Sequence, residues 1–517
     1  MPSSLRPLTT LLAFSTLTLS TFAAGSDWPQ WRGPDRSDVS KETGLLKSWP
    51  AEGPKRLWLF ENAGHGYSGP AIAKGKYYTI GTRDGSEILL VLDANTGQEL
   101  WTAKLGGILD NGWGGGPRGT PTVDGDRVYA LSGPGDLVCI STADGKILWQ
   151  TTMKKLGGKT PNWGYSESVL VVGPHVLCTP GGAQGTVAAL DKLTGKVAWQ
   201  TNELTEPAHY SSIVPAQING QPQLIQRNEK SVFGLAPKDG KLLWQTGFPG
   251  RTAVIPTPIV RGNEVYVTAG YGSGSKLVRI GADNQVTEVY ENKVMKNHHG
   301  GVVLVGNHVY GHNDNGWVCQ DFATGAESWM NKSLGKGAIT SADGMLYCLD
   351  ERSGALVLAE VSPTAWKEIS RFTLSPQTKI RSEKGKIWTH PVISHGKLYL
   401  RDQDLIYCFD VKAPGSTEPN GPAAFQPPSP RLSLRKRLRR LRQSTMVCDT
   451  HDGLPQSLRL LRTDKLGALL RRRVAQKTSN RVTPARLARL AHPALPSARR
   501  LPPVLSLTSP RKPPPCS

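Results

Sequence analysis

Cysteine is scarce and appears late in the chain. Seven cysteines occur in 517 residues, the first of them is Cys139, and no two are adjacent in sequence. A lipid-modified cysteine at the start of a mature chain is therefore not expected. A disulfide framework is not expected either, because such frameworks belong to small secreted domains. Cys139, Cys319, Cys348 and Cys408 stand beside a repeated turn where other copies have Ala or Leu, so we interpret them as small buried hydrophobes.

Long apolar runs and familiar catalytic motifs are also missing. After the N-terminus, no stretch approaches the ~20 apolar residues of a membrane span. We find no haem-attachment motif Cys-x-x-Cys-His, and no G-x-S-x-G elbow or Walker A loop in a fitting context. The Gly-rich string "NGWGGGPRG" is a weak phosphate-loop lookalike, because it does not lead into a helix. The sequence therefore offers no support for haem electron transfer or P-loop chemistry.

Acidic residues are scarce in only one part of the chain. Of the formal net charge of +21, residues 413–517 carry +17, from 17 Arg and 4 Lys against 4 acidic residues. The first 412 residues hold 41 basic and 37 acidic residues, a net charge of +4. The body is nearly neutral, so we expect it not to bind nucleic acid.

Residues 413–517 lack Trp, Tyr and Ile, and they favour Arg over Lys by 17 to 4, whereas the first 412 residues favour Lys by 26 to 15. A segment of this composition cannot bury a core and is predicted to be a disordered basic tail. Two interpretations stay open. The tail is a basic arm for nucleic acid or anionic lipid, or it is the product of a frameshift near residue 413 in GC-rich DNA.

The N-terminus, "MPSSLRPLTTLLAFSTLTLSTFAAGS", has the parts of a signal peptide. Arg6 supplies the basic start, residues 8–19 form a short apolar stretch, and residues 21–23 put small side chains where a signal peptidase reads them. Cleavage after Ala23 is predicted, and a disordered N-terminus is the alternative. We expect a periplasmic or secreted protein, a monomer without a transmembrane segment or lipid anchor.

One turn motif is repeated five times in the first 412 residues. The strings are "VLDANTGQELW", "CISTADGKILW", "ALDKLTGKVAW", "GLAPKDGKLLW" and "CQDFATGAESW". Each resembles a strand, a tight turn and a second strand with an aromatic residue. Successive units end 37 to 50 residues apart, at Trp58, Trp101, Trp149, Trp199, Trp244, Tyr290, Trp329 and Trp366. A period near ~40–45 residues built from short strands predicts an all-β propeller with four strands in each blade.

Eight blades are predicted. Seven complete units lie between Trp58 and Trp366. The last piece, "IWTHPVISHGKLYLRDQDLIYCFDVK", has three strands, and "KRLWLFEN" before the first unit supplies a fourth. Pairing the two chain ends completes one blade and removes exposed sheet edges. We therefore predict a lead-in over residues 24–54, an eight-bladed antiparallel propeller over residues 55–412, and the tail after it.

The string A-L-D-x-x-T-G-x-x-x-W at residues 189–199 resembles the pyrroloquinoline quinone (PQQ) repeat. That repeat occurs in quinoprotein dehydrogenases and in the outer-membrane assembly lipoprotein BamB, both eight-bladed propellers. The resemblance covers residues 28–412, and the opening "DWPQWRGPDR" resembles the start of exported PQQ-repeat proteins. The resemblance is specific for the propeller fold, and it is only a weak indication that the PQQ cofactor binds.

Residues just before the innermost strand of every blade should gather at one mouth of the central channel. In each unit these positions carry aromatic, basic or histidine side chains and a single carboxylate, Glu167. Such a mouth tolerates anions and suits a planar or sugar-like ligand, although a wet polar channel without function is the alternative. The candidate residues are His65, Tyr67, Trp113, Arg118, Trp163, Tyr165, Glu167, His209, Tyr210, Arg251, His298, His299, Lys336, Trp388 and His390.

A metal site is not expected. His298 and His299 are adjacent, and neighbours in an extended segment point opposite ways. His65, His299 and His390 could converge from different blades, but their spacing does not demand it. Resemblance to quinoprotein dehydrogenases implies a Ca²⁺ held by several oxygen ligands, an Asp base and commonly a disulfide between adjacent cysteines. The missing cysteine pair and the single carboxylate count against that chemistry.

Taken together, the residues favour an exported, non-catalytic propeller that binds a protein, a carbohydrate or a small ligand without a cofactor. Two alternatives stay open. One is a PQQ-dependent oxidoreductase with Ca²⁺ and an altered site. The other is a BamB-like outer-membrane assembly factor, which the absent lipid-anchor cysteine counts against. Propellers carry unrelated functions, so the fold decides none of these.

Overall fold

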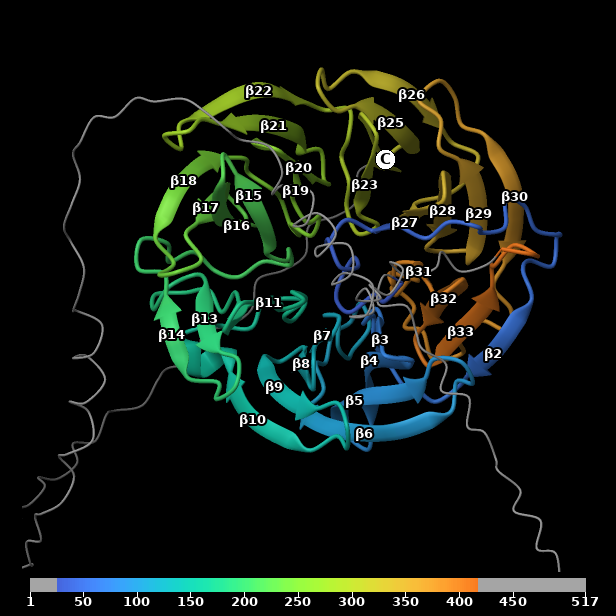
Figure 1. Cartoon of the computed structure of the whole chain (residues 1–517), viewed down its shortest axis with the longest axis horizontal. Helices are drawn as coiled ribbons and strands as arrows, with labels where there is room; N and C mark the ends of the chain where they lie inside the picture. Colours follow the sequence, from blue (N-terminus) through green and yellow to red (C-terminus); the bar gives the residue numbers. More distant parts are fainter. Residues whose placement is uncertain (1–25, 417–517) are drawn as a thin grey trace, which may run out of the picture. The chain divides into compact units, whose positions relative to one another are not determined.

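Short strands joined by tight turns make up almost all regular structure in the computed structural model, which describes residues 26–416. The strands form eight sheets arranged as a closed ring (Figure 1). Apart from one 3₁₀ turn, η1 (Met153–Leu156), the described part of the chain has no helix. The predicted all-β, eight-bladed propeller is confirmed.

Each sheet is a blade whose strands follow one another from the channel outward. Blade 1 is β3 (Ala71–Ala73), β4 (Lys76–Arg83), β5 (Ser86–Asp93) and β6 (Glu99–Gly106). Blade 2 is β7 (Thr122–Asp124), β8 (Arg127–Leu131), β9 (Asp136–Ser141) and β10 (Ile147–Thr152). Blade 3 is β11 (Leu170–Val172), β12 (His175–Cys178), β13 (Ala188–Asp191) and β14 (Val197–Gln200). Blade 4 is β15 (Val214–Ile218), β16 (Gln221–Arg227), β17 (Ser231–Leu235) and β18 (Leu242–Gly247).

Blade 5 is β19 (Ile259–Arg261), β20 (Glu264–Ala269), β21 (Gly274–Ile280) and β22 (Val286–Asn292). Blade 6 is β23 (Val302–Val305), β24 (His308–His312), β25 (Trp317–Asp321) and β26 (Glu327–Asn331). Blade 7 is β27 (Gly337–Ala342), β28 (Met345–Asp350), β29 (Ala355–Glu360) and β30 (Glu368–Thr373). Blade 8 is β31 (Val392–Ser394), β32 (Lys397–Asp402), β33 (Leu405–Asp410) and β2 (Arg56–Phe60).

The two ends of the propeller close the ring in blade 8. β2 comes from the start of the propeller and pairs antiparallel with β33 from its end, with Trp58 opposite Cys408. The predicted closure is confirmed. The pairing satisfies the backbone groups of β33 that would otherwise form an open edge.

The repeated turn locks neighbouring blades together. The Trp58 indole N–H donates to the Ala94 carbonyl at 3.3 Å, and Trp149 and Trp199 donate in the same way to carbonyls of the next blade's turn. Gly97, with φ of 73°, lies against the Trp58 ring, where a Cβ would come within 2.7 Å of it. The glycine of the turn therefore supplies a left-handed backbone and also leaves room for the preceding blade's aromatic ring.

Blade 7 departs from this pattern. Its Asp350–Gly354 turn joins β28 to β29, whereas the other copies join a third strand to a fourth. Trp366 consequently lies before β30 and not within it, so its predicted place in a fourth strand is wrong. Its ring still packs against Trp317 and Trp329 of blade 6. Trp49, from the lead-in, packs against Phe372 of β30 instead.

The lead-in is an ordered part of the ring. Figure 1 shows it running from the centre of the ring across β27 to the outer edge near β30 before it enters β2. Its strand β1 (Val39–Ser40) adds to blade 7 in parallel with β27, and Trp28 forms a bridge with Ile72 of blade 1. Segments that are far apart in sequence are thus tied together near the channel.

The core lies between blades, where the faces of successive sheets pack. Cys139, Cys178, Cys319, Cys348 and Cys408 are buried there as free thiols. The described residues contain no helix long and apolar enough to cross a membrane. The predicted signal peptide and nearly all of the predicted basic tail lie outside the described residues.

Candidate functional site

One cavity of about 440 Å³ opens at the channel mouth, and most of the predicted site residues surround it. They arrive from seven different blades, because each lies in the segment that leads into an innermost strand. The predicted residues in its wall are Tyr67, Trp113, Arg118, Trp163, Tyr210, His298, His299, Lys336, Trp388 and His390.

Five predicted residues do not line this cavity. His65 and Arg251 are exposed. His209 packs on Tyr210 and lies 3.8 Å from Glu229. Tyr165 and Glu167 are buried inside the blades.

Alternation along the chain explains the blade 3 result. Ser166 and Ser168 face the cavity, so their neighbours Tyr165 and Glu167 face the protein interior. The Tyr165 hydroxyl donates to the Pro180 carbonyl at 3.1 Å, and Glu167 accepts from the amide and hydroxyl of Thr179. The expectation that Glu167 is the carboxylate of the mouth is therefore wrong.

Glu351 is the only carboxyl among the residues that line the cavity. It lies just after β28, in the turn that distinguishes blade 7, and the Trp388 indole N–H donates to it at 3.1 Å. Burial raises the pKa of Glu351 above its ordinary value, while Lys336 and Trp388 oppose the rise. The carboxyl therefore binds its proton more tightly than an exposed glutamate does.

The larger wall residues missed from the sequence come from four other segments. Trp31 belongs to the lead-in, Tyr271 to the turn between β20 and β21, and Arg352 to the blade 7 turn. Lys384 and Lys386 belong to the long connection from β30 to β31. Its string "SEKGKIWTHP" also contains the predicted Trp388 and His390. This closeness in sequence is the signal that could have identified the two lysines as wall residues. Smaller wall residues are Ser166, Ser168, Ser212, Thr252, Ala253 and Ile255.

The lead-in contributes to the wall of the cavity. The Trp31 ring lies 4.7 Å from that of His390 and its indole donates to Thr257. Beside it, Asp38 lies 2.9 Å from Nδ1 of His390 and 2.8 Å from Nε of Arg32. These contacts join the lead-in to the residues that precede β31.

Aromatic rings form a continuous line around the cavity. Tyr67 packs on Trp388 at 4.9 Å, Trp388 stacks on His299 at 4.7 Å, and His299 lies 3.6 Å from His298. Tyr271 meets His298 edge-on at 4.4 Å. The side chain of Trp113 is 46% exposed at the opening. The cavity therefore offers both edges and faces of rings to a ligand.

His298 and His299 both reach the cavity, so the expectation that they point opposite ways is wrong. Residues 295–298 have no regular structure, and the alternation of an extended strand does not apply to them. Burial, together with Lys336, lowers the pKa of His298 to about 3. Burial also lowers the pKa of His299 well below its ordinary value. Both rings are neutral at physiological pH.

Five cations line the cavity, and none forms a salt bridge with a carboxylate of the described residues. Arg118 donates to backbone carbonyls of Gly114 and Gly116 and lies over the Tyr67 ring at 5.4 Å. Lys384 lies over the Trp113 ring at 5.8 Å. The other three are Lys336, Arg352 and Lys386. With one carboxyl of raised pKa against five cations, the wall is positively charged.

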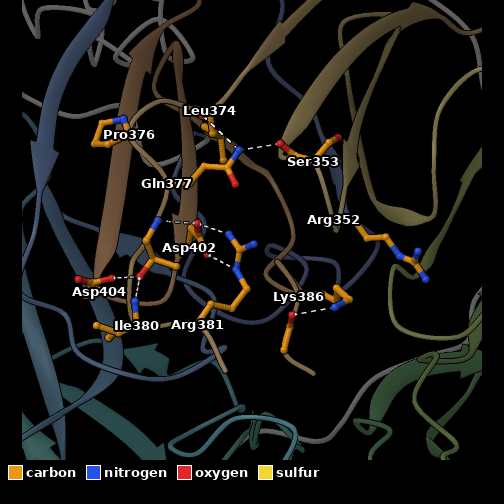
Figure 2. Close-up of polar contacts among 12 residues, drawn as sticks. Arg352, Ser353, Leu374, Pro376, Gln377, Ile380, Arg381, Lys386, Asp402 and Asp404 are labelled. Atoms are coloured by element: carbon orange, nitrogen blue, oxygen red, sulfur yellow. Dashed lines mark hydrogen bonds and ion pairs between the residues drawn. The ribbon is translucent and has the colours of Figure 1, made fainter. Parts of the chain in front are cut away.

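The connection that carries Lys384 and Lys386 is pinned by its own contacts (Figure 2). Asp402 of β32 accepts from the Thr378 amide and pairs with Arg381, and Asp404 accepts from the Thr378 hydroxyl. The positive charge of Arg381 is thereby balanced by the carboxylate of Asp402. A second hollow beside the cavity shares Arg352 and Lys386 with it, so these two cations stand between the two hollows.

The wall residues do not fit a calcium-bound quinone. A Ca²⁺ ion takes six to eight oxygen ligands, commonly several carboxylates. The wall has Glu351 alone, already bonded to Trp388. No group of three or more His, Cys, Asp or Glu side chains suited to a metal occurs among residues 26–416. We therefore derive no catalytic step through such a cofactor.

Comparison with known proteins supports the repeat. A PQQ-repeat family model described as "Outer membrane protein assembly factor BamB" matches residues 84–331, just under half of the chain. Residues 84–331 of this β-propeller are therefore similar to the PQQ repeat of that family. Quinohemoprotein alcohol dehydrogenase from Comamonas testosteroni has a similar fold, with a TM-score of 0.54 and 11% identity over 77% of this chain and 82% of that one. At that identity, the likeness concerns the fold alone.

Two proteins named outer membrane protein assembly factor BamB are also similar to this propeller in sequence. The one from Shewanella oneidensis is 24% identical over 251 residues, which cover 45% of this chain and 56% of that protein. The one from Moranella endobia is 22% identical over 279 residues, which cover 50% of this chain and 65% of that protein. The match thus spans between about half and two thirds of these relatives.

Proposed function

We propose that this protein is an exported binding propeller whose channel-mouth cavity holds an anionic ligand with a flat ring. The observation that carries the proposal is the set of five cations, none in a salt bridge with a carboxylate of residues 26–416, placed among aromatic rings around one cavity. Its volume of about 440 Å³ suits a small molecule or the end group of a larger one. Anionic groups would bind the cations, and a ring would stack on Trp113, Trp388 or Tyr271.

We assign a binding role and not catalysis, because the wall does not provide the several oxygen ligands that the calcium of a quinoprotein needs. We place the protein outside the cytoplasm, in agreement with the signal-peptide-like N-terminus. The name of the relatives, outer membrane protein assembly factor, points the same way.

The test is a fluorescence titration of the full-length protein with PQQ, used as a flat tricarboxylate probe, with and without Ca²⁺. We expect saturable quenching of the mouth tryptophans that is independent of Ca²⁺ and weakens with added salt. A triple variant in which Arg352, Lys384 and Lys386 are each replaced by Gln should bind the probe at least tenfold more weakly. The matched control replaces Lys146, Lys196 and Lys241, which lie on exposed turns outside the cavity.

Three outcomes would separate the possibilities. Equal loss in both triple variants, or no quenching at high probe concentration, would contradict the proposed site. Binding that requires Ca²⁺ would instead favour the quinoprotein oxidoreductase. A second candidate, assembly of outer-membrane proteins, is favoured by the family model and by both curated relatives. It predicts a protein partner whose binding does not change when the mouth cations are neutralised.

A further inference from the structure

Lys336 has a different kind of partner from Lys276 and Lys192, two other partly buried lysines. Lys276 pairs with Glu288 at 2.9 Å, and Lys192 pairs with Asp124 at 2.6 Å. Nζ of Lys336 instead lies 2.7 Å from Nδ1 of His298. A lysine beside a carboxylate keeps its proton, whereas one beside a neutral ring in an aromatic cavity is easier to deprotonate.

The surroundings of Lys336 act in the same direction. Burial lowers the pKa of Lys336, and Arg352 adds to the lowering, while Glu351 and Asp314 oppose it without forming a salt bridge. In the tautomer of the neutral His298 ring that carries its proton on Nε2, Nδ1 accepts a hydrogen bond from the Lys336 amine. An uncharged amine that donates in this way does not use its nitrogen lone pair in that bond.

We propose that Lys336 is a carbonyl-capturing amine, which forms an imine with an aldehyde or ketone group on a ligand held in the channel-mouth cavity. The inference rests on the proposed function, since the ligand is then an anionic ring compound that also carries a carbonyl. It assigns covalent capture to a propeller otherwise described as a binding protein.

The step balances without an oxidant or reductant. The Lys336 nitrogen attacks the carbonyl carbon, a C–N bond forms, and the carbonyl oxygen becomes a hydroxyl. That hydroxyl then leaves as water, which carries away the two hydrogens of the neutral amine, and a C=N bond remains. Glu351 is the wall residue able to supply a proton to the departing oxygen, because burial raises the pKa of its carboxyl.

The experiment uses 4-carboxybenzaldehyde, an aromatic aldehyde with one carboxylate, and traps imines on the full-length protein with cyanoborohydride. Peptide mapping by mass spectrometry then gives the modification rate of each lysine. At pH 7 we expect Lys336 to be modified at least tenfold faster than exposed Lys332 and Lys146. The pH midpoint of its rate should lie below theirs, and Lys336→Arg should abolish the fast site while keeping the positive charge.

A Lys336 rate no faster than that of Lys332 would overturn the inference. Binding of 4-(hydroxymethyl)benzoate, which has the same ring and carboxylate but no aldehyde, is measured in parallel by tryptophan fluorescence. Binding of this alcohol without fast capture would leave the proposed anion site standing and the imine refuted. Fast capture without binding of the alcohol or PQQ would refute the anion site and leave a reactive amine.

Discussion

The lead-in and the mouth of the propeller use cations in opposite ways. In the lead-in, Arg32 and Arg36 are 1% and 2% exposed. Arg36 donates to the carbonyls of Ser168, Ile213 and Val169, in blades 3 and 4, and Arg32 donates to Val302 of blade 6. At the mouth, the five wall cations face a cavity that also holds Glu351, and none of them forms a salt bridge with a carboxylate of the described residues.

This difference separates structural from ligand-binding charge. A buried guanidinium that satisfies several carbonyls ties blades together, and its net effect depends on those hydrogen bonds. A group of like charges that repel one another around an open cavity does not stabilise the fold. The second arrangement is useful only when an anion arrives.

Removing the hydrogen bonds of a lead-in arginine should have the largest effect on stability. Arg36→Met removes three hydrogen bonds to buried carbonyls, each worth roughly 1–3 kcal/mol when left unsatisfied. We expect the free energy of unfolding to fall by about 3 kcal/mol or more, measured by urea unfolding followed by circular dichroism. Arg251→Met, on an exposed loop, is the control and should change it by less than about 0.5 kcal/mol. Equal effects would show that Arg36 does not tie the blades.

Lowering the pH should decrease the free energy of unfolding, because buried neutral histidines lie near the mouth. His298 and His312 have folded-state pKa values of about 3 and about 4, because burial lowers them first and Lys336 second. An unfolded histidine has a pKa near ~6.5, so below that pH the unfolded state binds more protons. Their contribution to stability is present above about pH 6.5 and is lost as the pH falls toward 4. Each adds a slope of up to ~1.4 kcal/mol per pH unit.

The measurement is the free energy of unfolding between pH 4 and pH 7. A variant carrying His298→Asn and His312→Asn should have a shallower slope, because these two rings no longer contribute while His299 still does, and His65→Asn on the exposed loop is the control. An unchanged slope would mean that the two rings take up protons in the folded state. The positive charge of the mouth would then not come from Arg and Lys alone.

Neutralising the mouth should have the smallest effect on stability. Gln at positions 352, 384 and 386 removes three charges that form no salt bridge with a carboxylate in the described part of the chain, so the free energy of unfolding should change by less than about 0.5 kcal/mol per site. Any net change should be stabilising, since repulsion is relieved. Thermal unfolding at low salt measures it, and a loss of several kcal/mol would place these cations with Arg36 as structural groups.

The repeated turn predicted the blades because its chemistry is local. The Asp191 carboxylate accepts from the amide and hydroxyl of Thr194, and Gly195 supplies the left-handed backbone, all within five residues. Ring closure followed because "KRLWLFEN" and the incomplete last unit each lacked what the other had. The strand order around the turn of blade 7 was not predicted. Its copy of the turn joins the second strand to the third, and the string of residues alone does not show which two strands a turn joins.

The mouth was predictable in outline only. Position before an innermost strand placed Tyr67, Trp113 and Arg118 near the channel, since equivalent segments of a ring converge. Side-chain direction was not predictable, because Tyr165 and Ser166 differ by one residue and face opposite sides. Trp31 and Lys384 come from segments outside the repeat, so no repeat position marks them.

The sequence by itself determined the propeller, its blade count, its closure and the residue types that gather at one end, because turns and strand alternation act over a few residues. The tertiary structure decided which of those side chains share a cavity and which cations have partners. It also decided that Glu351, and not Glu167, is the carboxyl beside them. Those properties depend on distances between blades, and such distances exist only once the ring has closed.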